Sequence, residues 1–437
     1  MERTSMALRR HSAGNNGHRE VTMNRALRIL CVSALAVAFI TGDTNVSFSQ
    51  YGKKYKEAVQ RQREVQQKDL AEVRQQVEAI RQQIKENHWK FKAEMTEALK
   101  YRIEEITGAK SPSNLNREAK IQSQAGEKLF LEFLKKLAEY NEKKQRGGGK
   151  KRPERREETK REEYQEDTKR DEYRDDSRKD EAPGDDRRAD DTRTDDADRA
   201  KPDDSSHLGM VADPNAPAFN WRDAGKMTPV KHQLTCGSCW AFTACAVYEA
   251  IYLTANRVSL NLSEQQLVNC AADNRGSKAG TCDGGWYGKV FEYWTRTGAV
   301  LTTSVPYRNA NGSCTAFPRT TYKVAAWGYV KQDAGIPSVA EMKRALCKYG
   351  PIASTVKVTP AFQAFAGGIF DEHISTIGPR DVNHGIVIVG WDDSKKSYLI
   401  KNSWGTQWGE KGYMWIEYGC NNIGYGSAWM VPTSEKF

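Results

Sequence analysis

Cys239 is the residue best placed for covalent chemistry in this sequence. It follows Gly237 and Ser238 and precedes an apolar run that extends to Leu253. The run predicts a helix that begins at the cysteine, where exposed N–H groups and the positive end of the helix dipole stabilise a thiolate. Cys239 is therefore a candidate nucleophile, although free cysteines also serve as buried apolar residues.

A thiolate nucleophile needs a proton donor and a group that orients it, and later segments supply both. His384 lies 145 positions and Asn402 163 positions after Cys239. His384 precedes a predicted strand and can act as the base, while Asn402 can accept a hydrogen bond from the far ring nitrogen. Trp404 is expected to shield that hydrogen bond from water. The amide of Gln233, with the backbone N–H of Cys239, can form an oxyanion hole.

Together these segments resemble the papain-like, or cathepsin-like, cysteine peptidases. The pattern Cys-Gly-Ser-Cys-Trp at residues 236–240 is typical of that family, and the similarity covers about residues 219–432. The spacing to Asn402 is slightly longer than usual, which we attribute to a loop at residues 392–396. The resemblance implies an α+β, two-lobed papain-like fold, with a helical lobe, a β-barrel-like lobe and the active site in the cleft between them, preceded by a helical N-terminal region.

Local patterns agree with this architecture. A central helix is expected from Cys239 to about residue 256, and Ser263 has the sequence context of a helix cap. Beyond Cys314 the apolar residues alternate or form continuous runs, which is typical of strands. Strands are therefore predicted at residues 322–330, 352–358, 385–391, 398–401 and 412–417.

The resemblance also assigns residues to peptide binding. Gly284 and Gly285 would let an extended peptide approach the backbone, although two glycines can equally form a plain turn. The pocket for the second residue before the scissile bond would be bordered by aromatic residues and floored by Gly426, which favours an apolar residue over a basic one. The predicted substrate contacts are Gly284, Gly285, Trp286, Tyr287, Asn383, Trp404 and Gly426.

Eight cysteines follow residue 208, which indicates an oxidising compartment. Their spacing does not fix the pairing. The resemblance implies two disulfides, Cys236–Cys282 and Cys270–Cys314. A third bridge common in the family lacks one partner here, because residues 368–384 contain no cysteine. A Cys347–Cys420 pair is an alternative that we consider, and Cys245 is expected to be a buried helix residue.

The net charge of +10 suggests acidic partners, but no basic groove with interleaved aromatic residues accompanies it. Nucleic-acid binding is therefore not predicted. The expected partners are polypeptide substrates and the chain's own pro-segment, no metal or organic cofactor is required, and the sequence does not indicate an oligomeric state. The catalytic domain is placed at residues 213–437.

The N-terminus has the pattern of a targeting segment. Arg25 and Arg28 precede an apolar run at residues 29–40, which is too short to span a bilayer comfortably. Residues 1–42 are interpreted as a signal peptide with an N-terminal extension, in preference to a membrane anchor. This predicts a secreted or otherwise extracytoplasmic protein, in a lysosome-like compartment if the source is eukaryotic.

Residues 53–142 are predicted to be helical. Apolar residues recur with heptad-like spacing, the segment 111–114 breaks the helix, and a second amphipathic stretch covers residues 129–137. The first apolar seam contains Leu70, Val73, Val77, Ile80, Ile84 and Phe91. This region is interpreted as a pro-segment that occupies the cleft, with a coiled-coil or partner-binding arm as the alternative.

Residues 143–208 are rich in charge and, as far as His207, contain no Ile, Leu, Val, Met, Phe or Trp. Such a segment cannot bury a core, so a disordered linker is predicted, with a charged partner-binding tract as the alternative. The chain as a whole is predicted to be the precursor of a secreted cysteine endopeptidase that works through a thioester acyl-enzyme. A transpeptidase or ligase with the same site, and a helical-arm binding protein with a passenger peptidase domain, are the alternatives.

Overall fold

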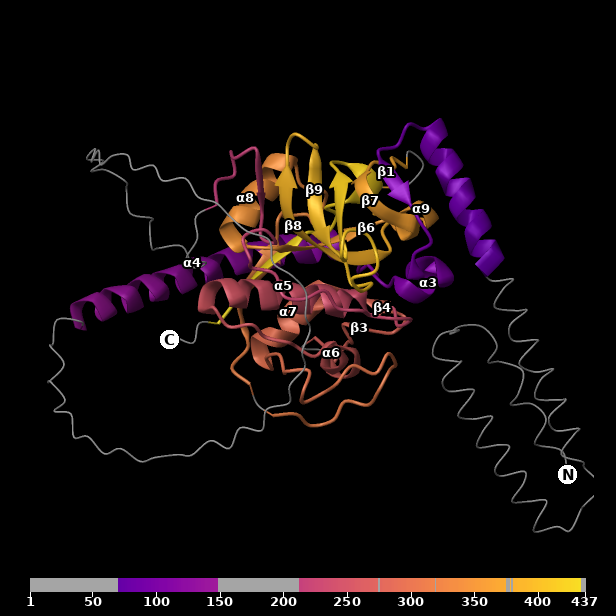
Figure 1. Ribbon diagram of the computed structural model, residues 1–437. Helices are drawn as coiled ribbons and strands as arrows, with labels where there is room; N and C mark the ends of the chain where they lie inside the picture. Colours follow the sequence, from indigo (N-terminus) through magenta and orange to yellow (C-terminus); the bar gives the residue numbers. More distant parts are fainter. Residues whose placement is uncertain are drawn as a thin grey trace, which may run out of the picture.

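The computed structural model describes residues 70–147, 212–273, 276–318, 320–374, 378 and 380–433. Within these ranges a helical half packs against a β-rich half, and the N-terminal elements lie along both, as Figure 1 shows. The predicted signal peptide and residues 148–208 of the predicted linker lie outside the described residues. In the part of the chain that is described, no helix is long and apolar enough to cross a membrane.

The helical half is organised around α5, which begins at Cys239 and ends at Asn256 as expected from the sequence. Most of its side chains are buried on all sides, which is typical of a helix at the centre of a domain. The predicted cap is also present, because Ser263 Oγ accepts a hydrogen bond of 3.0 Å from Gln266 N. The other elements of this half are α6 (Glu264–Cys270), β3 (Gly280–Thr281), β4 (Gly284–Gly285) and α7 (Tyr287–Arg296).

The β-rich half is one sheet in the order β1-β7-β10-β9-β8-β6-β11-β5, with β2 paired to β8. Its strand β8 is buried at every position except the last, because α5 packs on one face of it. The elements of this half are β2 (Ala218–Asn220), β5 (Val324–Tyr329), α8 (Val339–Tyr349), β6 (Ile352–Val356), α9 (Pro360–Ala364), β7 (Phe365–Phe370), β8 (His384–Asp392), β9 (Ser397–Lys401), β10 (Tyr413–Glu417), η2 (Cys420–Asn422) and β11 (Ala428–Pro432).

All five strands predicted from the sequence are present, and the α+β architecture is confirmed. Three strands of the same half, β2, β7 and β11, were not predicted, and β2 is only three residues long. The strand β7 contains Gly367 and Gly368, which weaken a strand signal, and β11 shows no alternation because it is buried throughout. The predicted loop at residues 392–396 is the turn between β8 and β9.

The N-terminal region is less helical than predicted. Residues 70–86 are helical, but the chain then forms β1 (Phe91–Ala93), η1 (Glu97–Lys100) and α3 (Ile103–Ile106). Phe91 therefore does not continue the helical seam. It lies in β1, which pairs with β7, and its ring centroid is 4.9 Å from that of Phe370. Tertiary pairing with the sheet overrides the local helix propensity of this segment.

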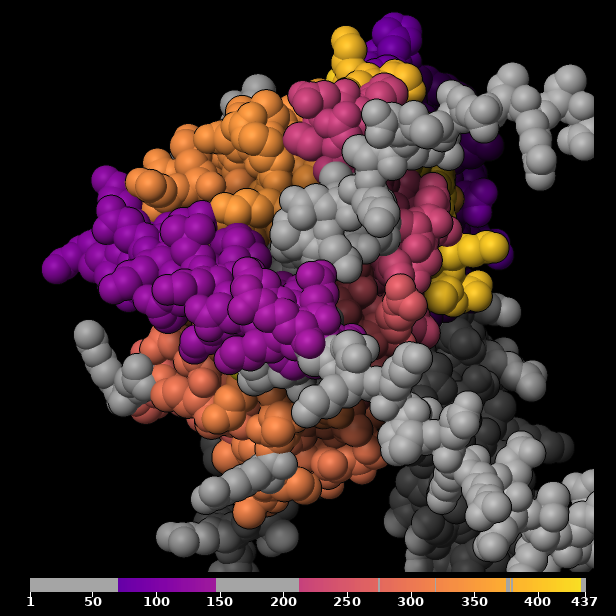
Figure 2. Space-filling model, turned by 90° about the vertical axis from the view of Figure 1, so that its left-hand side faces the viewer, coloured from indigo at the N-terminus to yellow at the C-terminus, as the bar shows by residue number. Residues whose placement is uncertain are grey.

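The long helix α4 (Leu115–Gly147) begins directly after the predicted break and covers the free edge of β5. Gln122 Nε2 donates to Trp327 O at 2.9 Å, and Tyr329 N donates to Ser123 Oγ at 3.1 Å. These side chains satisfy backbone groups that the last strand of a sheet would otherwise leave unpaired. Figure 2 shows α4, in purple, lying across the orange segments of the chain that follow residue 300.

A second set of contacts holds α4 against α8 and β11. The ring of Phe130, 1% exposed, lies 5.1 Å from Tyr349 and 5.9 Å from Trp429 between centroids. Glu127 accepts hydrogen bonds from Lys348 Nζ at 2.6 Å and from Tyr349 Oη at 2.7 Å. The helix is thus fixed by an apolar anchor and a polar one on adjacent turns.

Phe130→Ala should loosen α4 from the sheet. Removing a buried phenylalanine costs about 3–5 kcal/mol, whereas Leu131→Ala should cost little because Leu131 is 58% exposed on the same turn. Hydrogen exchange of the β5 amides is the measurement, because Tyr329 N–H is protected by Ser123. We expect faster exchange in Phe130→Ala only. Equal exchange in both variants would show that Phe130 does not anchor α4 to the sheet.

Candidate active site

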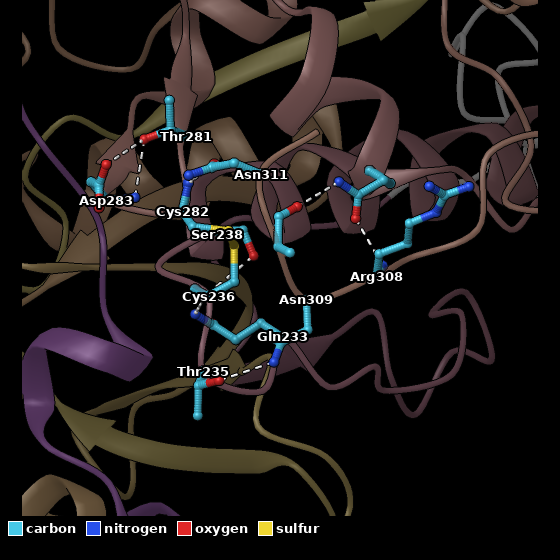
Figure 3. The surroundings of a disulfide bond; sticks show 12 residues. Gln233, Thr235, Cys236, Ser238, Thr281, Cys282, Asp283, Arg308, Asn309 and Asn311 are labelled. Carbon is cyan, nitrogen blue, oxygen red and sulfur yellow. Dashed lines mark hydrogen bonds between the residues drawn. A yellow bond between two sulfur atoms is a disulfide. The ribbon is translucent and has the colours of Figure 1, made fainter. Parts of the chain in front are cut away.

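The loop that precedes Cys239 is held by a disulfide between Cys236 and Cys282, as the resemblance implied. Figure 3 shows this bridge, which joins the loop before α5 to the β3–β4 connection. Asn309 Nδ2 donates to Thr235 Oγ1 at 2.9 Å, and Cys282 N donates to Asn311 Oδ1 at 2.8 Å. The bridge and these side-chain contacts fix the loop that precedes Cys239.

The second implied disulfide, Cys270–Cys314, is also present, but the Cys347–Cys420 hypothesis is wrong. Both of those cysteines are free thiols. Cys347 lies on α8, whereas Cys420 lies in η2 and its sulfur faces His373 Nε2 at 3.3 Å. Cys245 is buried in α5, as expected.

The structure brings the four candidate catalytic residues together at the junction of the two halves. Cys239 is the first residue of α5 and His384 the first of β8. His384 Nε2 and Asn402 Oδ1 are 2.8 Å apart, and the ring centroid of Trp404 lies 4.8 Å from that of the imidazole. Gly385 N donates to Cys239 Sγ at 3.3 Å, which places the thiol beside the residue that follows His384.

Gln233 is fixed by contacts at both ends of its side-chain amide. Its Oε1 accepts from Ser403 Oγ at 2.6 Å, and its Nε2 donates to Cys236 O at 3.0 Å. Its backbone N–H donates to Ser403 O at 2.9 Å. Ser403, which the sequence did not single out, therefore couples Gln233 to the loop that carries Asn402.

A segment of the chain's own N-terminal region lies over this site. The N–H groups of Gly108 and Ala109 both donate to Asn383 O at 2.8 Å. On the opposite side, Lys110 N donates to Gly285 O at 3.0 Å and Gly285 N donates to Gly108 O at 2.8 Å. Three predicted substrate contacts thus hold residues 106–110, because Trp404 Nε1 also donates to Ile106 O, at 3.0 Å.

The site is buried, and burial shifts the pKa values of its thiol and its imidazole. Burial raises the pKa of the Cys239 thiol to about 12 and lowers the pKa of His384 to about 4, against a smaller raising effect of Asn402. Both groups are therefore neutral at physiological pH. The Nδ1 atom of His384 has no hydrogen-bond partner among the described residues. In this covered form the thiol and imidazole do not make an ion pair.

The remaining predicted substrate residues form an aromatic cluster. The rings of Trp286 and Tyr287 stack with centroids 4.7 Å apart. Trp286 Nε1 donates to Tyr329 Oη at 3.0 Å, and Tyr287 Oη donates to Gly426 O at 2.7 Å. Tyr329 was not predicted, since nothing in the sequence of β5 connects it with Trp286. Within the described ranges no group of His, Cys, Asp and Glu residues is arranged to hold a metal ion.

Comparisons with known proteins identify the family. The model of the Papain family cysteine protease matches residues 215–433, and the chain belongs to that family. "Cysteine proteinase 2" of Zea mays is 36% identical over 219 residues, covering 49% of this chain and 58% of the relative. "Thiol protease aleurain" of Arabidopsis thaliana is 34% identical, covering 49% of this chain and 59% of the relative. The chain thus spans somewhat more than half the length of these curated relatives.

Among solved structures, the bromelain protease from Ananas comosus in complex with the E64 inhibitor is 32% identical. That match has a TM-score of 0.42 and covers 50% of this chain and 100% of the bromelain chain. The family predicted from the sequence is confirmed by the family match.

Acidification should weaken the covered form of the site. Covered His384 stays neutral down to a pKa of about 4, whereas an exposed imidazole takes up a proton from pH 6.5. Between pH 6.5 and pH 4 the covered form therefore binds fewer protons than an open form. As the pH falls through this range, the stability of the covered form relative to the open form decreases by up to roughly 3 kcal/mol.

Hydrogen exchange of the Gly108 and Ala109 amides, corrected for the intrinsic pH dependence, measures this loss. Cys239→Ala prevents self-cleavage, and adding His384→Gln removes the titrating ring. As the pH is lowered, we expect the protection of these amides to decrease more steeply in Cys239→Ala than in the double variant that also carries His384→Gln. The same slope in both variants would show that His384 does not control opening.

Proposed function

We propose that this chain is the precursor of a cysteine endopeptidase whose active site comprises Cys239, His384, Asn402 and Gln233. The observation that carries the proposal is the buried junction where the helix start at Cys239 meets the His384–Asn402 hydrogen bond of 2.8 Å. Membership of the papain family supports the same reaction. The substrates would be polypeptides, and the chemistry needs no group beyond these side chains.

In the uncovered site, water would return to both groups and allow the proton of Cys239 to pass to His384. The thiolate attacks the peptide carbonyl carbon, which forms the S–C bond, and His384 then protonates the amine as the C–N bond breaks. A water molecule next attacks the thioester and gives one proton to His384, which returns it to the departing thiolate. Asn402 holds the imidazole in the required orientation throughout.

The negative oxygen of each tetrahedral intermediate would be stabilised by two N–H donors. The backbone N–H of Cys239 lies at the start of α5, where it has no partner within the helix. Gln233 contributes its side-chain amide, of which one N–H is bound to Cys236 O and the other is free to donate. The Gln233–Ser403 contact keeps this amide in place.

Residues 70–147 would act as a pro-segment that covers the site. The segment contacts the catalytic domain in three places. Strand β1 pairs with β7, residues 106–110 lie over the thiol, and α4 covers β5. Gly108 packs against the loop that precedes Cys239, because a Cβ atom added to it would clash with Gly237 O. The segment is therefore placed to block access to the nucleophile.

A charged contact supports the docking of β1. Lys90 Nζ lies 2.9 Å from Glu417 and 3.5 Å from Asp371, and the hydrogen bond to Glu417 is the main reason that the pKa of Lys90 is raised. Lys90 N also donates to Asp371 Oδ1 at 2.9 Å. These contacts favour an N-terminal region that binds its own catalytic domain over an N-terminal region that presents a free surface to another protein.

The two disulfides favour an oxidising, extracytoplasmic compartment for this protein. A secreted or lysosome-like location agrees with them and with the targeting pattern at residues 1–42. A transpeptidase would use the same residues and would differ in transferring the acyl group to an added amine. Product analysis with such an amine separates the two reactions.

Cys239→Ala should abolish hydrolysis of fluorogenic peptide amides by a protein that begins at residue 209. Cys245→Ala is the matched control, because Cys245 is a free, buried thiol on the same helix. The longer chain that begins at residue 51 should hydrolyse the same peptides far more slowly, because its site is covered. Residual activity of Cys239→Ala equal to that of Cys245→Ala would rule out the proposed nucleophile, and equal rates for the two lengths would rule out the pro-segment.

A further inference from the structure

We propose that Trp286 and Tyr287 fill the subsite for the second residue before the scissile bond, so that this enzyme accepts only Gly, Ala or Ser there. The inference rests on the proposed function and specifies its substrate class. It narrows the sequence-based expectation of an apolar residue at this position to a small one.

The covering segment locates the subsite. Gly108 lies against the loop that precedes Cys239, because a Cβ atom added to Gly108 would clash with Gly237 O. The next residue, Ala109, pairs with Gly285 through the hydrogen bonds that flank it. The second position from the nucleophile is therefore the one opposite Gly285, at the start of the segment that carries Trp286 and Tyr287.

The two aromatic side chains extend from this position to the opposite wall. Tyr287 is 0% exposed, and its hydroxyl reaches the backbone oxygen of Gly426 just before β11. Burial, with smaller effects of Tyr329, Tyr425 and Cys239, raises the pKa of Tyr287. Trp286 is 2% exposed and is tied to Tyr329 on β5. Each ring is thus held by a hydrogen bond at its far end as well as by stacking.

Gly426 shows how closely the rings approach the floor of the subsite. A Cβ atom added to Gly426 would lie 2.6 Å from the Trp286 ring and 3.2 Å from Tyr287 Oη. The backbone of residue 426 is also at a positive φ of 66°, which favours glycine. The floor therefore contacts the two rings directly, and no space for a leucine or phenylalanine side chain remains between them.

The residue that the chain itself places at this position agrees with the size limit. Ala109 is 6% exposed, so the methyl group is covered on docking. A larger side chain would have to displace Tyr287, break its hydrogen bond to Gly426 O and separate two stacked rings.

The test is a set of fluorogenic peptide amides that differ only in the second residue before the scissile bond. The enzyme is the full chain after its N-terminal region has been removed by processing. We expect kcat/KM for Ala to exceed that for Leu and Phe by about tenfold or more. Tyr287→Ala should reverse this order by opening the subsite, whereas Tyr293→Ala, which removes a buried tyrosine from the same helix, should leave it unchanged.

The outcomes are distinct. Hydrolysis with Leu or Phe at least as fast as with Ala in the unmodified enzyme would overturn the inference and leave the proposed function intact. No hydrolysis of any peptide would overturn the proposed function and the inference with it. Tyr287→Phe keeps the ring and should keep the preference for Ala, so it tests the filled subsite if Tyr287→Ala does not fold.

Discussion

Four backbone hydrogen bonds join residues 108–110 to the two walls of the site. Access to the site and the ionisation of its groups depend on them. On one wall, Asn383 O accepts hydrogen bonds from two N–H groups of the segment. On the other wall, Gly285 donates one hydrogen bond to the segment and accepts one from it. Backbone pairing of this kind does not depend on side chains, so the same groups can pair with the backbone of an extended substrate. The covering segment and a substrate would therefore compete for the same backbone positions.

The same pairing excludes water, and the exclusion controls the ionisation of the two reacting groups. A thiolate and an imidazolium are both disfavoured in a dry site, so the pKa of Cys239 rises and that of His384 falls. Attraction between the two charges offsets this penalty only when they approach closely and are otherwise solvated. In the proposed mechanism, covering the site would thus disable the candidate nucleophile chemically as well as sterically, although the four candidate residues already lie together.

Much of this site could be predicted from the sequence because its signals are local. Cys239 lies at a helix start, His384 at the start of a buried strand and Asn402 in a distinctive motif, and the structure brings these residues to one junction. The covering segment could not be predicted in the same way. The helix propensity of residues 87–110 concealed a strand and an extended stretch whose geometry is set by β7, Gly285 and Asn383. Tyr329 and Ser403 likewise gain their importance only from contacts distant in the sequence.

The long-range contacts of the N-terminal region also explain why it can hold an extended segment in place. An extended chain has no internal hydrogen bonds, and ordering it costs conformational entropy for every residue. Here the ordered stretch is short and lies between two anchors, β1 on β7 before it and α4 on β5 after it. Each anchor pairs with a sheet edge that would otherwise be exposed, so docking is favourable independently of the site. Residues 106–110 therefore depend on the two anchors for their position. Disturbing either anchor would weaken the covering of Cys239, even though neither anchor contacts this residue.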